Sequence, residues 1–123
     1  MHRLAVFNAL HRGTGLASPI ECADPTRLAF VGVYPLDLSA PMMRQFLRNR
    51  GFDIIPEFGR AYHVRTFEVD RGLVEADRWI AEPDLIKPRS LFAFNDDELV
   101  EKLNQLNVPL ERLEPFYKSD YPI

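Results

Sequence analysis

Two uninterrupted apolar runs dominate the hydrophobic pattern of this chain. Residues 28–34 are closed by Pro35, and residues 91–94 lie between Pro88 and Asn95. Apolar runs without polar alternation are typical of strands that are buried on both faces. The sequence therefore predicts two buried strands, and it predicts that the strand at 91–94 is central in its sheet.

A third strand is predicted over residues 62–69, where the apolar residues fall on both faces. Tyr62 and Val64 share one face, whereas Phe67 and Val69 share the other. A bulge between the two pairs, near residues 65–66, would reconcile them.

The most strongly signalled helix covers residues 96–106. Asn95 is a good N-cap, and Glu98 stands three residues later, as in a capping box. Asn107 suits the left-handed conformation that ends many helices. The inward stripe repeats at helical spacing through Leu99, Leu103 and Leu106.

Two further helices are predicted at 41–50 and 71–80. Ser39 is the expected N-cap of the first, and Gly51 is its expected left-handed stop. Asp70 is the expected N-cap of the second. Between the first helix and the strand at 62–69, residues 53–56 are predicted as a short strand or edge segment.

Strands alternating with helices predict an α/β fold, with α+β as an alternative. We expect a single domain over residues 1–123, with a mixed central sheet of about four or five strands and about three helices. Residues 28–109 form its core, and residues 110–123 are a docked C-terminal tail. The segment 1–27 is poorly specified: residues 3–10 fit a short helix or an edge strand, and residues 13–26 are predicted as a long irregular connection.

Composition and charge narrow the classes of partner. The chain has 123 residues, 46% of them hydrophobic, and a single cysteine, Cys22, which excludes a disulfide framework. No apolar run is long enough for a membrane span or a signal peptide, so a cytoplasmic location and no membrane partner are expected. Residues 1–65 carry eight arginines against five acids, and residues 66–123 carry seven basic residues against thirteen acids. This acidic half argues against nucleic acid and favours a basic protein partner.

Candidate chemistry is sparse. The glycines form no nucleotide-binding motif and the histidines have no metal-ligand spacing, so neither a cofactor nor a metal site is predicted. His63 is the one candidate general base, and a small hydrolase or nuclease that uses His63 with Glu68 or Asp70 stays open as an alternative. A homo-oligomer formed through a strand edge near Ile54 is a second alternative.

Three features together resemble the small cytoplasmic immunity proteins of bacterial polymorphic-toxin systems, including contact-dependent growth inhibition. They are a short acidic α/β chain without a catalytic motif, the helix DDELVEKL at 96–103, and the tyrosine-bearing acidic tail FYKSDYPI at 116–123. The resemblance is one of type and covers residues 28–123.

The resemblance implies a non-catalytic protein that binds a cognate toxin domain, often a basic nuclease, and occludes its active site or functional surface. A monomer is slightly favoured. An acidic ring would speed association with a cationic partner, and aromatic anchors would supply most of the affinity. The candidate ring residues are Asp97, Glu101, Glu111, Glu114 and Asp120, and the candidate anchors are Tyr117 and Tyr121.

Overall fold

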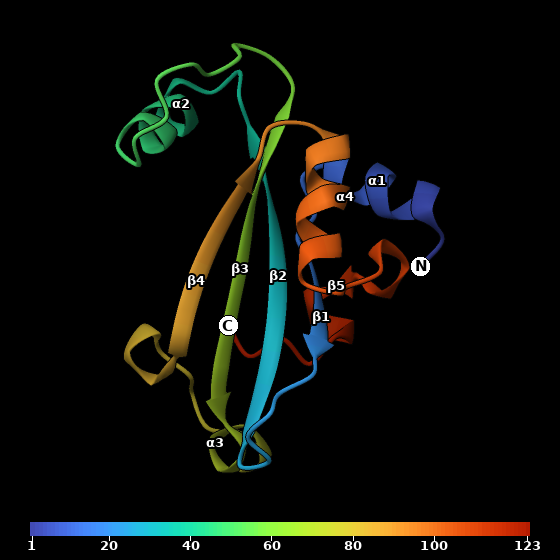
Figure 1. The fold of residues 1–123 in the computed structure, drawn as a ribbon, viewed down its shortest axis with the longest axis vertical. Helices are drawn as coiled ribbons and strands as arrows, with labels where there is room; N and C mark the ends of the chain where they lie inside the picture. Colours follow the sequence, from blue (N-terminus) through green and yellow to red (C-terminus); the bar gives the residue numbers. More distant parts are fainter.

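Four strands follow one another as an antiparallel meander in the computed structural model, which describes residues 1–123 (Figure 1). A short fifth strand returns to pair with the outer side of β1, so the sheet order is β4-β3-β2-β1-β5. The strands are β1 Leu16–Ile20, β2 Arg27–Asp37, β3 Arg60–Asp70, β4 Ile86–Ala93 and β5 Glu114–Pro115.

The predicted α/β class, with a sheet of four or five strands in one domain, is confirmed. Every pairing is antiparallel, so the parallel component of the expected mixed sheet is absent. The strands are joined by turns and short helices, and each strand returns beside the previous one, which is the arrangement of an α+β fold.

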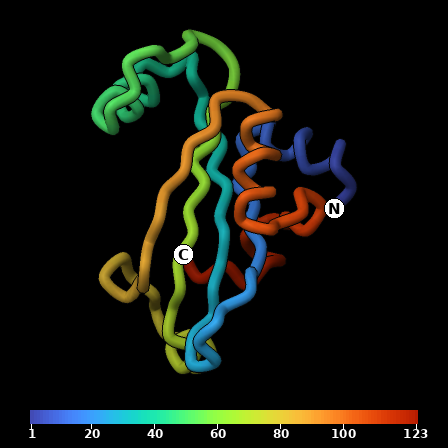
Figure 2. Tube along the Cα trace, viewed as in Figure 1, coloured from blue at the N-terminus to red at the C-terminus, as the bar shows by residue number.

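Four helices surround the sheet, and they are α1 Arg3–His11, α2 Pro41–Arg48, α3 Arg71–Glu75 and α4 Asp96–Gln105. Figure 1 shows α1 and α4 together on one side of the sheet and α3 at one end of the long strands. The trace in Figure 2 shows α2 and the loop after it projecting at the opposite end. None of the helices combines the length and apolar character that a bilayer crossing requires.

The sheet is packed on both faces. We call the side covered by α1 and α4 the helix face and the side covered by the C-terminal tail the tail face. The helix-face core includes Val6, Leu10, Val31, Val33, Tyr62, Val64, Leu99, Leu103 and Leu113. The tail-face core includes Ala17, Phe30, Phe67, Val69, Ile80, Leu85 and Tyr121.

Two packed faces explain the imperfect alternation in β3. Tyr62 and Val64 lie in the helix-face core and Phe67 and Val69 lie in the tail-face core, as predicted. The pairing of β3 with β2 runs without interruption, so the two pairs need no bulge there. The irregularity lies in the pairing with β4, between Thr66 and Glu68.

The prediction that the strand at 91–94 is central was wrong, because β4 is the edge strand of the sheet. Its first half is mostly exposed and contains Pro88, which an edge strand tolerates because no neighbour needs its missing N–H. Its second half is covered on both faces. Ala93 packs in the helix-face core, and Phe92 packs against residues around α2. The apolar run therefore indicates that both faces of the strand are covered, and it does not indicate where the strand lies in the sheet.

Two elements predicted in the middle of the chain were also wrong. Residues 53–56 form no strand, and Ile54 is 94% exposed in the loop between α2 and β3. The proposed strand edge near Ile54 is therefore not there. Asp70 does accept a hydrogen bond from the backbone N–H of Gly72 at 2.7 Å, but α3 ends at Glu75 instead of continuing to residue 80.

At the N-terminus the helical alternative is correct over Arg3–His11, and the irregular connection predicted at 13–26 contains β1. That prediction was wrong because it took Pro19 as a sign of irregular structure. β5 pairs only with Leu16 and Ala17, so β1 has a neighbour on one side only at Pro19. The N-cap of α2 is Ala40, because the Ser39 hydroxyl donates to Asp37 instead.

Asn95 is the N-cap of α4, as predicted, but Glu98 returns the bond to the Asn95 side chain and not to its backbone N–H as a capping box would. The backbone N–H of Glu98 donates to Asn95 Oδ1 at 2.8 Å, and the Asn95 side-chain amide donates to the Glu98 carboxylate at 2.9 Å. Asn107 has φ +58°, the left-handed conformation expected of it.

The C-terminal tail is docked, as predicted, and two glycines allow it to lie close to the sheet. A Cβ at Gly32 would collide with the ring of Tyr121, and a Cβ at Gly15 would lie 2.5 Å from the ring of Phe116. Glycine is required at both positions because the aromatic rings occupy the space of a side chain.

Candidate functional site

The seven candidate partner-binding residues fall into three separate places. Asp97 and Glu101 are exposed on α4. Glu111 is exposed in the 3-10 turn Leu110–Arg112, and Glu114 is half-buried in β5. The remaining three, Tyr117, Asp120 and Tyr121, line one groove on the tail face.

This groove, which we call the tail groove, has a volume of about 530 Å³ and a mostly apolar lining. Its floor is the sheet, one wall is the C-terminal tail, and the other wall is the end of α3 with the segment that follows it. The floor residues are Pro19, Leu28 and Phe30; the tail contributes Phe116, Tyr117, Asp120, Tyr121 and Pro122; the opposite wall contributes Val74, Asp77, Arg78 and Ile80.

Stacked aromatic rings hold the tail wall in place. The rings of Phe116 and Tyr121 stack with centroids 4.8 Å apart, and the edge of Tyr121 meets Phe30 at 6.1 Å. The hydroxyls of Tyr121 and Tyr34 share a hydrogen bond of 2.7 Å. Burial and this bond raise the pKa of Tyr121, so its hydroxyl stays protonated at neutral pH. Tyr121 therefore forms part of the wall and does not project as a free anchor.

The rim of the tail groove carries exposed aromatic and charged side chains. Tyr117, which lines the groove, is 81% exposed. Trp79 is 89% exposed and stands between the lining residues Arg78 and Ile80 without being part of the lining itself. Asp77 and Asp120 both have a left-handed backbone, with φ +52° and +58°, and neither forms an ion pair. Aspartate is among the residues that adopt this conformation most readily.

Sequence reasoning missed half of this groove. It predicted one helix over residues 71–80, whereas α3 ends at Glu75, and it gave Asp77 no role. The available signals were Gly72 and Asp77, two residues that disfavour a helix interior and argue for an early end. Tyr117 and Asp120 were named as candidate partner-binding residues from the resemblance, and the structure places both in the lining of this groove.

Asp97 borders a different hollow, of about 640 Å³, between α1, β3 and the start of α4. Among its polar groups, Asp96 contacts two other side chains. Its carboxylate lies 3.0 Å from His11 Nε2 and accepts a hydrogen bond from the Tyr62 hydroxyl at 2.6 Å. Asp96 therefore ties α1, β3 and α4 together.

His63 lies half-buried on the tail face between β2 and β4. Its ring stacks on Phe92 at 4.7 Å, and its Nε2 is 2.8 Å from Ser90 Oγ. Burial, with the nearby cations of Arg50 and Arg65, lowers the pKa of His63 to about 4, so the ring is neutral at pH 7.

The structure does not bring His63 together with either of its proposed carboxylates. Residues 63 and 68 point to opposite faces of β3, because side chains alternate along a strand. Asp70 is occupied as the cap of α3. No group of three or more histidine, cysteine, aspartate or glutamate side chains is placed to hold a metal ion.

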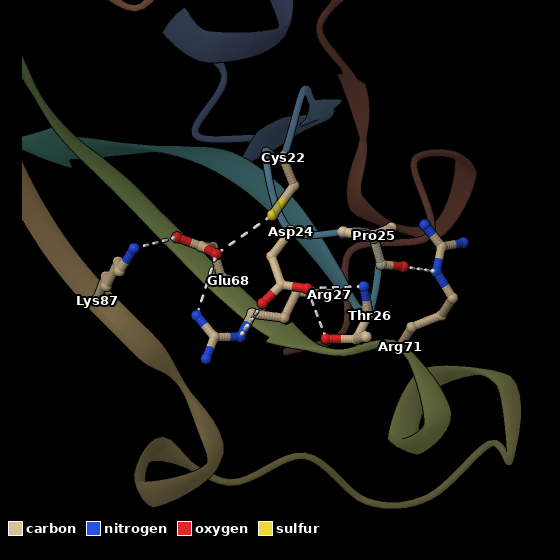
Figure 3. A network of polar contacts seen from close by, with 8 residues as sticks. All are labelled: Cys22, Asp24, Pro25, Thr26, Arg27, Glu68, Arg71 and Lys87. Atoms are coloured by element: carbon tan, nitrogen blue, oxygen red, sulfur yellow. Dashed lines mark hydrogen bonds and ion pairs between the residues drawn. The ribbon is translucent and has the colours of Figure 1, made fainter.

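Glu68 belongs instead to a polar network that anchors the loop between β1 and β2 (Figure 3). Cys22 Sγ donates to Glu68 at 3.2 Å, and the cations of Arg27 and Lys87 each lie 3.6 Å from its carboxylate. In the same loop Asp24 accepts from Thr26 and lies 3.5 Å from Arg27 Nε.

Burial and the hydrogen bond to Glu68 raise the pKa of the Cys22 thiol. The thiol is therefore protonated at neutral pH and is a poor nucleophile. Its place in the network is structural.

In comparisons with known proteins, no family model, curated protein or solved structure matched the chain.

Proposed function

We propose that this protein is a non-catalytic immunity protein that binds a cognate toxin domain and neutralises it by occluding its active site or functional surface. The observation that carries the proposal is the tail groove, which is lined in part by the exposed Tyr117, with the exposed Trp79 next in sequence to the lining residues Arg78 and Ile80. Tryptophan and tyrosine dominate the binding energy of protein interfaces, and they are costly to leave in water without a partner.

The charge of the chain supports a basic partner, such as a nuclease domain. The net charge is −3, and the tail and α4 both lie in the acidic half of the sequence. An acidic surface attracts a cationic protein over several ångströms and raises the association rate, which suits an inhibitor that must act before its target does damage.

The test is calorimetric titration of this protein with the C-terminal domain of the polypeptide encoded immediately upstream, together with rescue of growth in cells that express that domain. We expect nanomolar or tighter binding, about −12 kcal/mol or better, and rescue by wild-type protein. Absence of both heat and rescue contradicts the proposal.

A pair of variants tests whether binding and rescue depend on the tail groove or on any exposed apolar side chain. Tyr117→Ala removes an exposed rim aromatic without disturbing the core and should weaken both binding and rescue. Ile54→Ala removes a side chain that is even more exposed, at the opposite end of the molecule, and is the matched control.

A further inference from the structure

We infer that the tail groove is the contact site for the partner, and that it receives a large apolar or aromatic side chain flanked by lysine or arginine. This inference rests on the proposed function and specifies which surface acts and what chemistry it recognises. The competing surface is the exposed face of α4 with the two ring residues Asp97 and Glu101.

The size and lining of the tail groove fit an apolar anchor. A cavity of about 150 Å³ lined by aliphatic and aromatic residues holds a benzene ring, so about 530 Å³ has room for an aromatic side chain and an aliphatic neighbour. The floor is Leu28 and Phe30, which water wets poorly, and an entering side chain would displace that water favourably.

The charges on the rim select the flanking residues. Asp77 and Asp120 stand on opposite walls of the groove and neither is ion-paired, whereas Arg78 is the one cation in the lining. Two free carboxylates, one on each wall, favour a segment with a cation on either side of its anchor.

The groove is also already formed. The tail wall is fixed by ring stacking and by the bond between Tyr34 and Tyr121, so binding requires little ordering of this protein. The hollow beside α4 is a weaker candidate. Asp96, one of its two carboxylates, is already engaged by His11 and Tyr62, and only two of its eight lining residues, Phe58 and Phe94, are hydrophobic.

The first arm of the test measures affinity for the upstream-encoded toxin domain at low and high salt. The double variant Asp77→Asn with Asp120→Asn removes both rim charges, and asparagine tolerates the left-handed backbone of these positions. We expect at least a tenfold weaker Kd at low salt and a smaller dependence on salt. The double variant Asp53→Asn with Glu57→Gln makes the same charge change in the exposed loop at the far end of the molecule and is the matched control.

A third double variant, Asp97→Asn with Glu101→Gln, tests the competing surface on α4. If this variant loses affinity and the rim variant does not, the inference fails while the proposed function stands. If the rim variant alone loses affinity, both stand.

The second arm decides the case in which the toxin domain does not bind. Trp79 is the only tryptophan of the chain and stands in sequence between two residues of the groove lining, Arg78 and Ile80, so its emission is the readout chosen for peptide binding. The probes are the peptides Lys-Phe-Lys-Leu-Lys, Glu-Phe-Glu-Leu-Glu and Lys-Ser-Lys-Ser-Lys. A saturable shift with the first peptide alone, lost in the rim variant, supports the groove although the proposed function has failed. No shift, or an equal shift with all three peptides, overturns the inference.

Discussion

The hydrogen bond between Tyr34 and Tyr121 offers a quantitative test of how the tail is attached to the sheet. Replacing Tyr121 by Phe keeps the ring and its contacts with Phe116 and Phe30 but removes one partner of a 2.7 Å bond in a partly buried setting. Such a bond contributes a net of about 1 kcal/mol, and the hydroxyl left behind loses its partner. We therefore expect Tyr121→Phe and Tyr34→Phe each to lower the free energy of unfolding by about 1 kcal/mol.

The double variant is the decisive measurement. Once either hydroxyl is gone the second has no bond to lose, so the combined loss should be close to one single loss, with a coupling energy of about 1 kcal/mol. Urea unfolding followed by circular dichroism resolves a coupling energy of this size. With a dependence of the unfolding free energy on urea of about 2 kcal/mol per molar, about 1 kcal/mol corresponds to a midpoint difference of about 0.5 M.

The control for this cycle is Tyr34→Phe combined with Tyr62→Phe. The Tyr62 hydroxyl donates to Asp96 on the other face of the sheet, so these two losses should add. Additive losses for Tyr34 and Tyr121 would refute the placement of the tail, and with it the wall of the tail groove.

Three further predictions concern other parts of the fold. The folded-state pKa of His63 is lowered from 6.5 to about 4, so between these pH values the unfolded chain binds a proton that the folded protein does not. The free energy of unfolding should therefore fall as pH drops from 6.5 toward 4 and then level off, and His63→Gln should flatten that fall in urea titrations. A Gly32→Ala Cβ would lie 2.6 Å from Tyr121 Cζ, so this variant should lose about 1–3 kcal/mol of stability, and a loss below about 0.5 kcal/mol contradicts the close approach. Asn95→Ala removes the N-cap of α4 and should lower stability by about 1 kcal/mol, whereas Asn104→Ala, exposed in the same helix, should be neutral or slightly stabilising in thermal melts.

The sequence predicted best where the signal is local. The start of α4 is specified by Asn95 and Glu98 within one turn, and its end by Asn107. Chain connectivity and neighbouring strands do not alter such signals, so these boundaries were correct. The pattern of β3 was also informative, because its two pairs of apolar residues belong to two cores on opposite faces.

Predictions failed where the outcome depends on which distant segment covers a residue. The run at 91–94 is apolar because it packs against α2 on one face of the sheet and within the helix-face core on the other. A strand covered by helices on both faces has the same apolar sequence as a strand that lies between two others. Residues 53–56 have the composition of a strand, but in the structure they lie in the loop between α2 and β3 and pair with no other strand.

The tail groove illustrates the same limit for function. Its floor comes from β1 and β2, one wall from the last residues of the chain, and the other from residues 74–80. Nothing near Asp77 in the sequence indicates that Asp120 will line the same groove, because that arrangement depends on α3 ending early and on the tail crossing Gly32. The acidic helix was visible because its charges are contiguous, whereas Asp77 and Asp120 are separated by more than forty residues. If the rim variant weakens binding and the α4 variant does not, the surface that a contiguous pattern suggested will have been the wrong one, and the surface assembled by tertiary packing the functional one.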